Sequence, residues 1–185
     1  LEDISISETQ INKFNYNPDW SLYPSMKYGT IRSLDYLNWR YGKHPFFDYK
    51  IVIQGRVNRP AVCIYRIEKS YGSYESLVAH IVDFYFPSDL IGKKDARDVL
   101  KSVVLTIKKR GCSFVDFYCS MPFFSSIFEE LGAKEEPEDI EILPSKLEPI
   151  LHKNFNQNFV YFSKDKIYPK SEDMYITKSD IDGDS

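Results

Sequence analysis

The sequence has few of the side chains that most often act as nucleophiles, bases or metal ligands, with three His and three Cys among 185 residues. The cysteines, Cys63, Cys112 and Cys119, are odd in number and match no zinc-binding spacing, so we predict a reducing, cytoplasmic location. A net charge of −3 gives no field that would collect phosphates. This balance argues against general nucleic-acid binding and against attachment to anionic membranes.

Long apolar runs are also missing from the sequence. The longest uncharged apolar stretch near a helix, Ser102–Ile107, is far shorter than the roughly 20 residues that cross a bilayer. The chain opens at Leu1 without an apolar run before a cleavage site, so we predict no signal peptide. Aromatic residues are abundant instead, with 13 Phe, 14 Tyr and 2 Trp, and they predict a well-filled core.

The composition along the chain divides it into three predicted parts: an irregular N-terminal arm over residues 1–30, a folded domain over 31–165, and a polar, acidic tail over 166–185. Pro18 and Pro24 interrupt any periodic pattern in the arm. Ser33 then suits the N-cap of a short helix, Leu34–Tyr41. Three strands follow where β-branched and aromatic residues run between turn formers, and their spacing favours an antiparallel meander: Tyr49–Gln54, Ala61–Glu68 and Leu77–Phe86.

The clearest helix signal is the apolar stripe of Asp95–Arg110, which Gly111 ends. A strand, Ser113–Cys119, follows it. Because this helix connects two strands, we predict a βαβ crossover in which Leu77–Phe86 and Ser113–Cys119 lie side by side and parallel.

A second helix is predicted from Pro122, capped by Gly132, and a last strand at Asn158–Ser163. The fold class is therefore α/β (α+β), with a mixed, mostly antiparallel central sheet and one βαβ crossover. The second helix should bury five apolar residues: Phe123, Phe124, Ile127, Phe128 and Leu131.

This order of elements from Ser33 to Phe162, with the helix ending Phe128-Glu129-Glu130-Leu131-Gly132-Ala133, resembles the acyl-CoA N-acyltransferase (GNAT) superfamily. The resemblance implies that the two parallel strands splay apart and that the pantetheine of acetyl-CoA or another acyl-CoA lies in the opening. The strand residues that would line the cofactor are Phe84, Tyr85 and Phe86.

The same resemblance places the cofactor pyrophosphate on the amides that begin the crossover helix, where helix N-termini favour negative charge. In this chain the loop between Pro87 and Ala96 offers Gly92, Lys93 and Lys94 for that role. It also contains Asp89 and Asp95, and a carboxylate at a helix start competes with a phosphate for the same amides.

A second resemblance concerns Leu37-Asn38-Trp39-Arg40-Tyr41, His44-Pro45 and the acidic ending Asp180–Asp184. These segments are similar to GNAT-type domains of bacterial proteins associated with surface polysaccharide synthesis, which often contain two such domains in tandem. The resemblance implies a divergent second domain, a preceding GNAT domain as a partner, and an amine or amino sugar as the small-molecule acceptor.

N-acyl transfer needs a base, and His80 and Asp83 are the candidates in the strand Leu77–Phe86. Strand alternation puts their side chains on opposite faces, so both can serve one cleft only if a β-bulge reverses the phase. Phe128 stands where many family members carry a tyrosine that protonates the leaving thiolate, and Phe has no proton to give. Tyr118 is the nearest substitute.

Two further residues have alternative interpretations. Asp116 lies in an apolar strand, so burial would require a polar partner, and it is either a paired structural group or a catalytic one. Cys119 with His80 and Asp83 would form a thiol mechanism, although a small buried hydrophobe is the more frequent role of Cys in strands. Two functions therefore stay open: an N-acyltransferase, or a catalytically silent GNAT-like domain that binds a partner or ligand.

Overall fold

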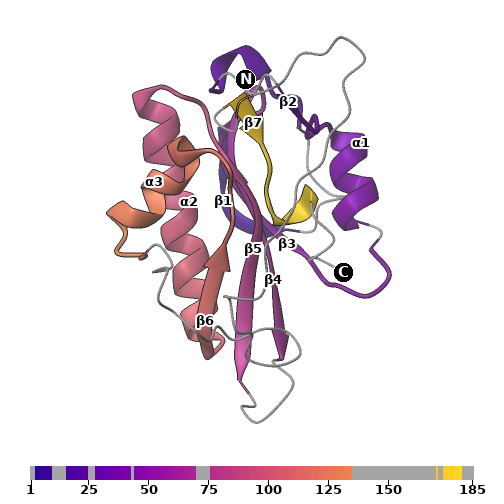
Figure 1. The fold of residues 1–185 in the computed structure, drawn as a ribbon, viewed down its shortest axis with the longest axis vertical. Helices are drawn as coiled ribbons and strands as arrows, with labels where there is room; N and C mark the ends of the chain where they lie inside the picture. Colours follow the sequence, from indigo (N-terminus) through magenta and orange to yellow (C-terminus); the bar gives the residue numbers. More distant parts are fainter. Residues whose placement is uncertain are drawn as a thin grey trace.

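The computed structural model describes residues 3–9, 16–24, 28–42, 44–69, 76–134, 170 and 173–180. At its centre is a five-stranded sheet in the order β1-β3-β4-β5-β6 (Figure 1). All neighbouring strands are antiparallel except β5 and β6, which are parallel. The strand bounds are β1 (Asp3–Thr9), β3 (Lys50–Arg56), β4 (Arg59–Lys69), β5 (Leu77–Tyr85) and β6 (Cys112–Phe117).

Helices cover both faces of the sheet. On one face lie α2 (Leu90–Lys109) and α3 (Pro122–Glu130), and α1 (Leu34–Leu37) lies over the other (Figure 1). The Ser33 hydroxyl caps α1 by accepting a hydrogen bond from the Tyr36 amide at 3.1 Å. None of the described helices is long and apolar enough to cross a bilayer.

A second, two-stranded parallel sheet joins segments from the two ends of the chain, β2 (Tyr28–Gly29) and β7 (Met174–Tyr175). A 3-10 turn, Lys178–Asp180, follows β7 and packs near β5. A further 3-10 turn, Trp20–Leu22, lies in the N-terminal segment. Residues 173–180 are thereby held beside the sheet.

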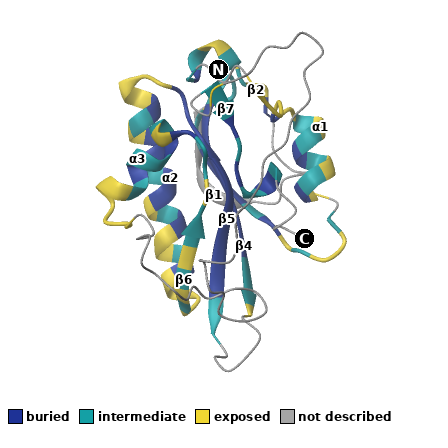
Figure 2. Cartoon of the chain, in the orientation of Figure 1, coloured by how far each residue is buried: buried dark blue, intermediate teal, exposed yellow. Residues whose placement is uncertain are grey.

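The predicted fold class is confirmed, because the sheet is mixed and mostly antiparallel and α2 connects the parallel strands β5 and β6. This is the order of elements that the resemblance to the acyltransferase fold implied. Burial follows the layers: the central strands and the inward side of α2 are buried, and its outer side is exposed (Figure 2). The predicted strand Asn158–Ser163 lies outside the described residues.

Two secondary-structure predictions were wrong. Residues 3–9 were expected to be irregular, yet they form β1 along the edge of β3, because pairing with an existing strand supplies order that a short, polar segment does not encode. The crossover helix was expected to begin at Asp95 and instead begins at Leu90, since Asp89 provides an N-cap five residues earlier than expected.

The second helix differs from its prediction in what it buries. Phe124 and Ile127 are buried and the rings of Phe123 and Phe128 are partly buried, but Leu131 is 37% exposed. The helix ends at Glu130, so Leu131 leaves the helical path before its side chain reaches the core.

Candidate functional site

A β-bulge in β5 determines where its two polar side chains point. The register with β4 pairs Ile81 with Tyr65 and Asp83 with Ile64, so Val82 is an extra residue on β5. Such a residue shifts the alternation of side chains by one step. His80 and Asp83 therefore lie on the same face of the sheet, the face covered by α1. This is the β-bulge that both side chains were predicted to need in order to face one cleft.

Asp83 is fully buried and bound by four donors. Its carboxylate accepts hydrogen bonds from Arg32 Nε at 2.9 Å and from three hydroxyls, those of Tyr41 at 3.0 Å, Tyr175 at 2.5 Å and Thr177 at 3.5 Å. Arg32 is 1% exposed and also pairs with Asp180. Burial raises the pKa of both tyrosines well above its usual range, and the charge of Asp83 adds to this effect, so both remain protonated donors.

His80 belongs to a separate, charged cluster. Its Nδ1 lies 3.0 Å from both carboxylate oxygens of Asp116, which is the polar partner that Asp116 was predicted to need. Lys178 Nζ lies 2.5 Å from Asp116, and Glu68 lies 3.7 Å from His80 Nε2. Burial raises the pKa of Asp116, but the bond from His80 and the charge of Lys178 lower it by more, so the net shift is downward.

The ladder between β5 and β6 ends at the pair Ile81 and Phe117, where β6 itself ends. Beyond it β5 continues to Tyr85, while the chain after β6 bridges to Thr177 through Cys119 instead of to β5. Aromatic rings pack at the point of divergence: Phe128 stacks on Phe117 with centroids 4.5 Å apart, and Phe84 lies 5.1 Å from Phe128. The carbonyl of Phe84 accepts a hydrogen bond from the Tyr175 hydroxyl at 3.1 Å. Side chains of the protein itself, those of Phe117, Phe128 and Tyr175, therefore lie where the resemblance would place the pantetheine.

The start of α2 is occupied by a carboxylate. Asp89 Oδ1 accepts from the Gly92 amide at 2.7 Å, and both Asp89 oxygens lie 2.6 Å from Arg59 NH2. The bond from the Gly92 amide lowers the pKa of Asp89, and Arg59 adds to this effect, so the group is anionic near neutral pH. A Cβ on Gly92 would lie 2.2 Å from the Pro87 carbonyl oxygen, so the absence of a side chain serves close packing.

The two predicted phosphate-binding lysines do not converge at the start of α2. Lys93 Nζ lies over the Phe123 ring at 5.2 Å, and Lys94 pairs with Asp98 one helical turn later at 2.9 Å. Because α2 begins at Leu90, all three residues proposed for the pyrophosphate are inside the helix rather than in a loop.

The other predicted residues are dispersed. Tyr118 lies past the end of β6 and is 43% exposed. Tyr85 is buried with its hydroxyl 3.0 Å from that of Tyr16, and Phe86 is buried against α3. Burial raises the pKa of the Cys119 thiol to about 12, so it is not a thiolate at neutral pH.

The residues do not fit acyl-CoA at either end of the site that the resemblance implies. A pyrophosphate at the start of α2 would meet the carboxylate of Asp89, and a pantetheine amide would compete with Tyr175 for the Phe84 carbonyl. The anion at the helix start is the stronger objection, because like charges repel and the amide is already bonded.

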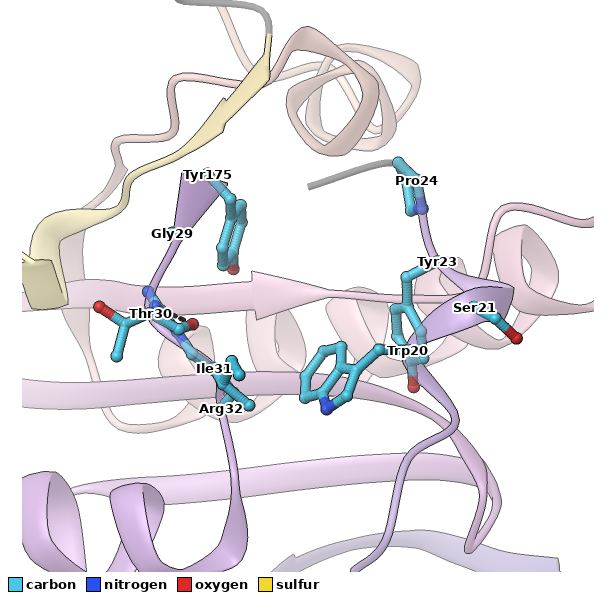
Figure 3. A pocket seen from close by; sticks show the side chains of 9 residues that line it. All are labelled: Trp20, Ser21, Tyr23, Pro24, Gly29, Thr30, Ile31, Arg32 and Tyr175. Carbon is cyan, nitrogen blue, oxygen red and sulfur yellow. Dashed lines mark hydrogen bonds between the residues drawn. The ribbon is translucent and has the colours of Figure 1, made fainter. Parts of the chain in front are cut away.

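A separate pocket of about 480 Å³ lies on the side of β7 and the N-terminal segment (Figure 3). Backbone bonds hold the segment in place, from the Asp19 amide to the Asn58 carbonyl at 2.7 Å and from the Ser88 amide to the Leu22 carbonyl at 2.9 Å. The residues that line the pocket are Trp20, Ser21, Tyr23, Pro24, Gly29, Thr30, Ile31, Arg32 and Tyr175.

Sequence reasoning missed this pocket and the partner of Asp83. Arg32 precedes a predicted N-cap and carries no periodic signal. One of the two tryptophans, Trp20, stands in a segment rich in proline and asparagine, and that unusual setting was the available indication of a binding surface.

Comparison with known proteins gives little further guidance. No protein-family model matches the sequence, and no curated protein matches it. Among solved structures, a transcriptional regulator from Bacillus halodurans C-125 is similar at 15% identity, over 60% of this chain and 76% of that chain, with a TM-score of 0.45. That similarity is too low to carry a functional argument, so the proposals below rest on the geometry of this chain.

Proposed function

We propose that this chain is a small-molecule-binding domain that has an acyltransferase-like fold and no acyl-CoA site. The observation that carries the proposal is the bond from the Gly92 amide to Asp89 at 2.7 Å, because it puts an anion where the cofactor pyrophosphate would bind. Two further features support it: Asp83 is held by fixed donors, and Phe128 packs between other rings.

Calorimetric titration of the whole chain with acetyl-CoA tests the proposal. We expect no saturable heat up to about 1 mM cofactor. The matched variant is Asp89→Ala, which releases the Gly92 amide and removes the competing charge, at a cost of about 1 kcal/mol for the lost N-cap. If the wild type binds acetyl-CoA, the proposal is wrong, and the double variant Lys93→Glu, Lys94→Glu then shows whether those lysines hold the phosphates.

The second candidate is transfer of an acyl group from acyl-CoA to an amine, with an amino sugar as one acceptor. It is favoured by the divergence of β5 and β6 after Ile81 and by the bulge that puts His80 and Asp83 on one face. Release of free CoA thiol in the presence of an amine, lost in the variant His80→Gln, would establish it instead. The tandem arrangement and the link to surface polysaccharides remain predictions of the resemblance.

A further inference from the structure

The pocket beside β7 has a buried floor and an exposed rim. Tyr23, Tyr175 and Arg32 are 4%, 2% and 1% exposed, whereas Ile31 is 69% exposed. Its volume, about 480 Å³, is within the range of roughly 300–1,000 Å³ typical of small-molecule sites. Figure 3 shows Tyr175 across the pocket from Trp20 and Tyr23, with the backbone from Gly29 along one side. The space therefore suits a ligand of one or two rings.

The charge on the pocket wall is already neutralised. Among the described residues that line the pocket, Arg32 is the one that is ionised, and each of its three nitrogens donates to the protein: Nε to Asp83, NH1 to the Thr30 carbonyl and NH2 to Asp180. A phosphate would have to displace carboxylates from Arg32, and a cation would find no carboxylate among these described lining residues. Both charged classes of ligand are therefore disfavoured.

The remaining surface is aromatic on the walls and polar at the rim. The Trp20 ring is tilted by 46° to the Tyr23 ring, so these two lining rings form an angled wall rather than a parallel slot. At the rim, the hydroxyls of Ser21 and Thr30 donate to carboxylates, and a hydroxyl oxygen that donates can still accept a hydrogen bond.

We propose that this pocket binds an uncharged, ring-shaped small molecule that packs an apolar face on Trp20 and keeps its polar edge at the rim. Pyranosides and nucleosides share this chemistry, and the test distinguishes them. The inference rests on the proposed function and deepens it by naming the class of ligand. Aromatic faces attract such rings because both surfaces are apolar, and nucleobases in particular stack on aromatic side chains.

Tryptophan fluorescence measures binding directly, because the chain has two tryptophans and the other one, Trp39, is 70% exposed in the turn after α1. In the variant Trp39→Phe, Trp20 is the sole indole reporter. We expect a saturable change in its emission with methyl pyranosides or with nucleosides. Glucose 6-phosphate or nucleoside monophosphates should bind about tenfold more weakly than their uncharged counterparts.

Calorimetry with the same uncharged compounds measures how much Trp20 contributes. Trp20→Ala should weaken binding at least about fivefold, whereas Trp39→Ala should leave it unchanged. If circular dichroism shows that Trp20→Ala is unfolded, Ile31→Glu at the exposed rim is the alternative variant, with a loss of about threefold expected from crowding and desolvation of the added carboxylate.

Three results would overturn the inference: no saturable binding of any uncharged ring up to about 10 mM, equal binding by folded Trp20→Ala, or tighter binding of the phosphorylated compounds. The acetyl-CoA titration distinguishes failure of the pocket inference from failure of the proposed function. If neither the rings nor acetyl-CoA bind, the pocket assignment fails and the loss of the cofactor site stands. If acetyl-CoA binds, the proposed function fails whatever the pocket does.

Discussion

Asp83 and His80 are three residues apart on β5 and share one face of the sheet, yet their surroundings differ in kind. Asp83 is 0% exposed and its carboxylate is held by a guanidinium and three hydroxyls. His80 faces Asp116, whose side chain is 24% exposed, and Lys178, whose side chain is 23% exposed. The first group connects three segments of the chain, whereas the second is a mixed-charge cluster near the surface.

The contrast indicates that burial and the number of hydrogen-bond donors decide how strongly a polar residue contributes to stability. A buried carboxylate held by four donors acts mainly on stability, because removing a donor leaves a buried polar group unsatisfied. The charged partners of His80 are about a quarter exposed, so solvent screens them and their effect on stability is smaller. Substituting each group and measuring the change in the free energy of unfolding shows how much it contributes to stability.

The largest effect is expected from Arg32→Met. This change leaves Asp83 and Asp180 without their shared cation, and breaking a buried ion pair typically costs about 3–5 kcal/mol in the free energy of unfolding. Urea denaturation measures it. The control is Lys101→Met on the exposed side of α2, with a change of about 0.5 kcal/mol or less. A loss below about 1 kcal/mol for Arg32→Met would mean that the network is not buried as described.

A smaller effect is expected from Tyr175→Phe. The variant keeps the ring but removes the hydroxyl that donates to Asp83 and to the Phe84 carbonyl, so about 1–3 kcal/mol of stability should be lost. The matched change Tyr118→Phe removes a hydroxyl from a residue that is 43% exposed and should have no measurable effect. Equal losses in the two variants would remove the distinction between the buried network and the surface.

The smallest effect is expected from Asp116→Asn, at about 1 kcal/mol near neutral pH, because Asp116 itself and its partner Lys178 are partly exposed, at 24% and 23%. The pKa of Asp116 is lowered in the folded chain, so its contribution is present above the usual value of 3.8 and is lost as the pH falls through the folded value. The difference in melting temperature between wild type and variant should therefore shrink below about pH 4. A difference that grows in acid would contradict the lowered pKa.

Several parts of this structure were predictable because they depend on local pattern. Ser33 caps α1, Gly111 adopts a positive φ of 79° after α2, and the strands β3, β4 and β5 follow runs of β-branched and aromatic residues. The parallel placement of β5 and β6 followed from the connecting helix. Two errors came from the same kind of local reasoning: β1 carries too short a pattern, and the start of α2 was placed by its apolar stripe although the N-cap, Asp89, lies before that stripe.

The site was less predictable, since its geometry depends on one inserted residue and on distant partners. Strict alternation separates His80 from Asp83, and only the extra residue Val82 brings them to one face. From its apolar neighbours, Asp116 was expected to pair with a helix N–H, a Lys or a Tyr. Lys178 is a partner of that kind, whereas the second partner, His80, was not expected.

By itself, the sequence determined the order of helices and strands from α1 to α3, the mixed sheet with its crossover, and the lack of a strong charge of one sign. These properties follow from the spacing of apolar residues, which acts over a few residues, and from the overall composition. Only the tertiary structure decided that Arg32 neutralises Asp83 and that Trp20 and Tyr175 line one pocket. Charge pairing and burial depend on which distant segments meet, and that follows from the path of the whole chain.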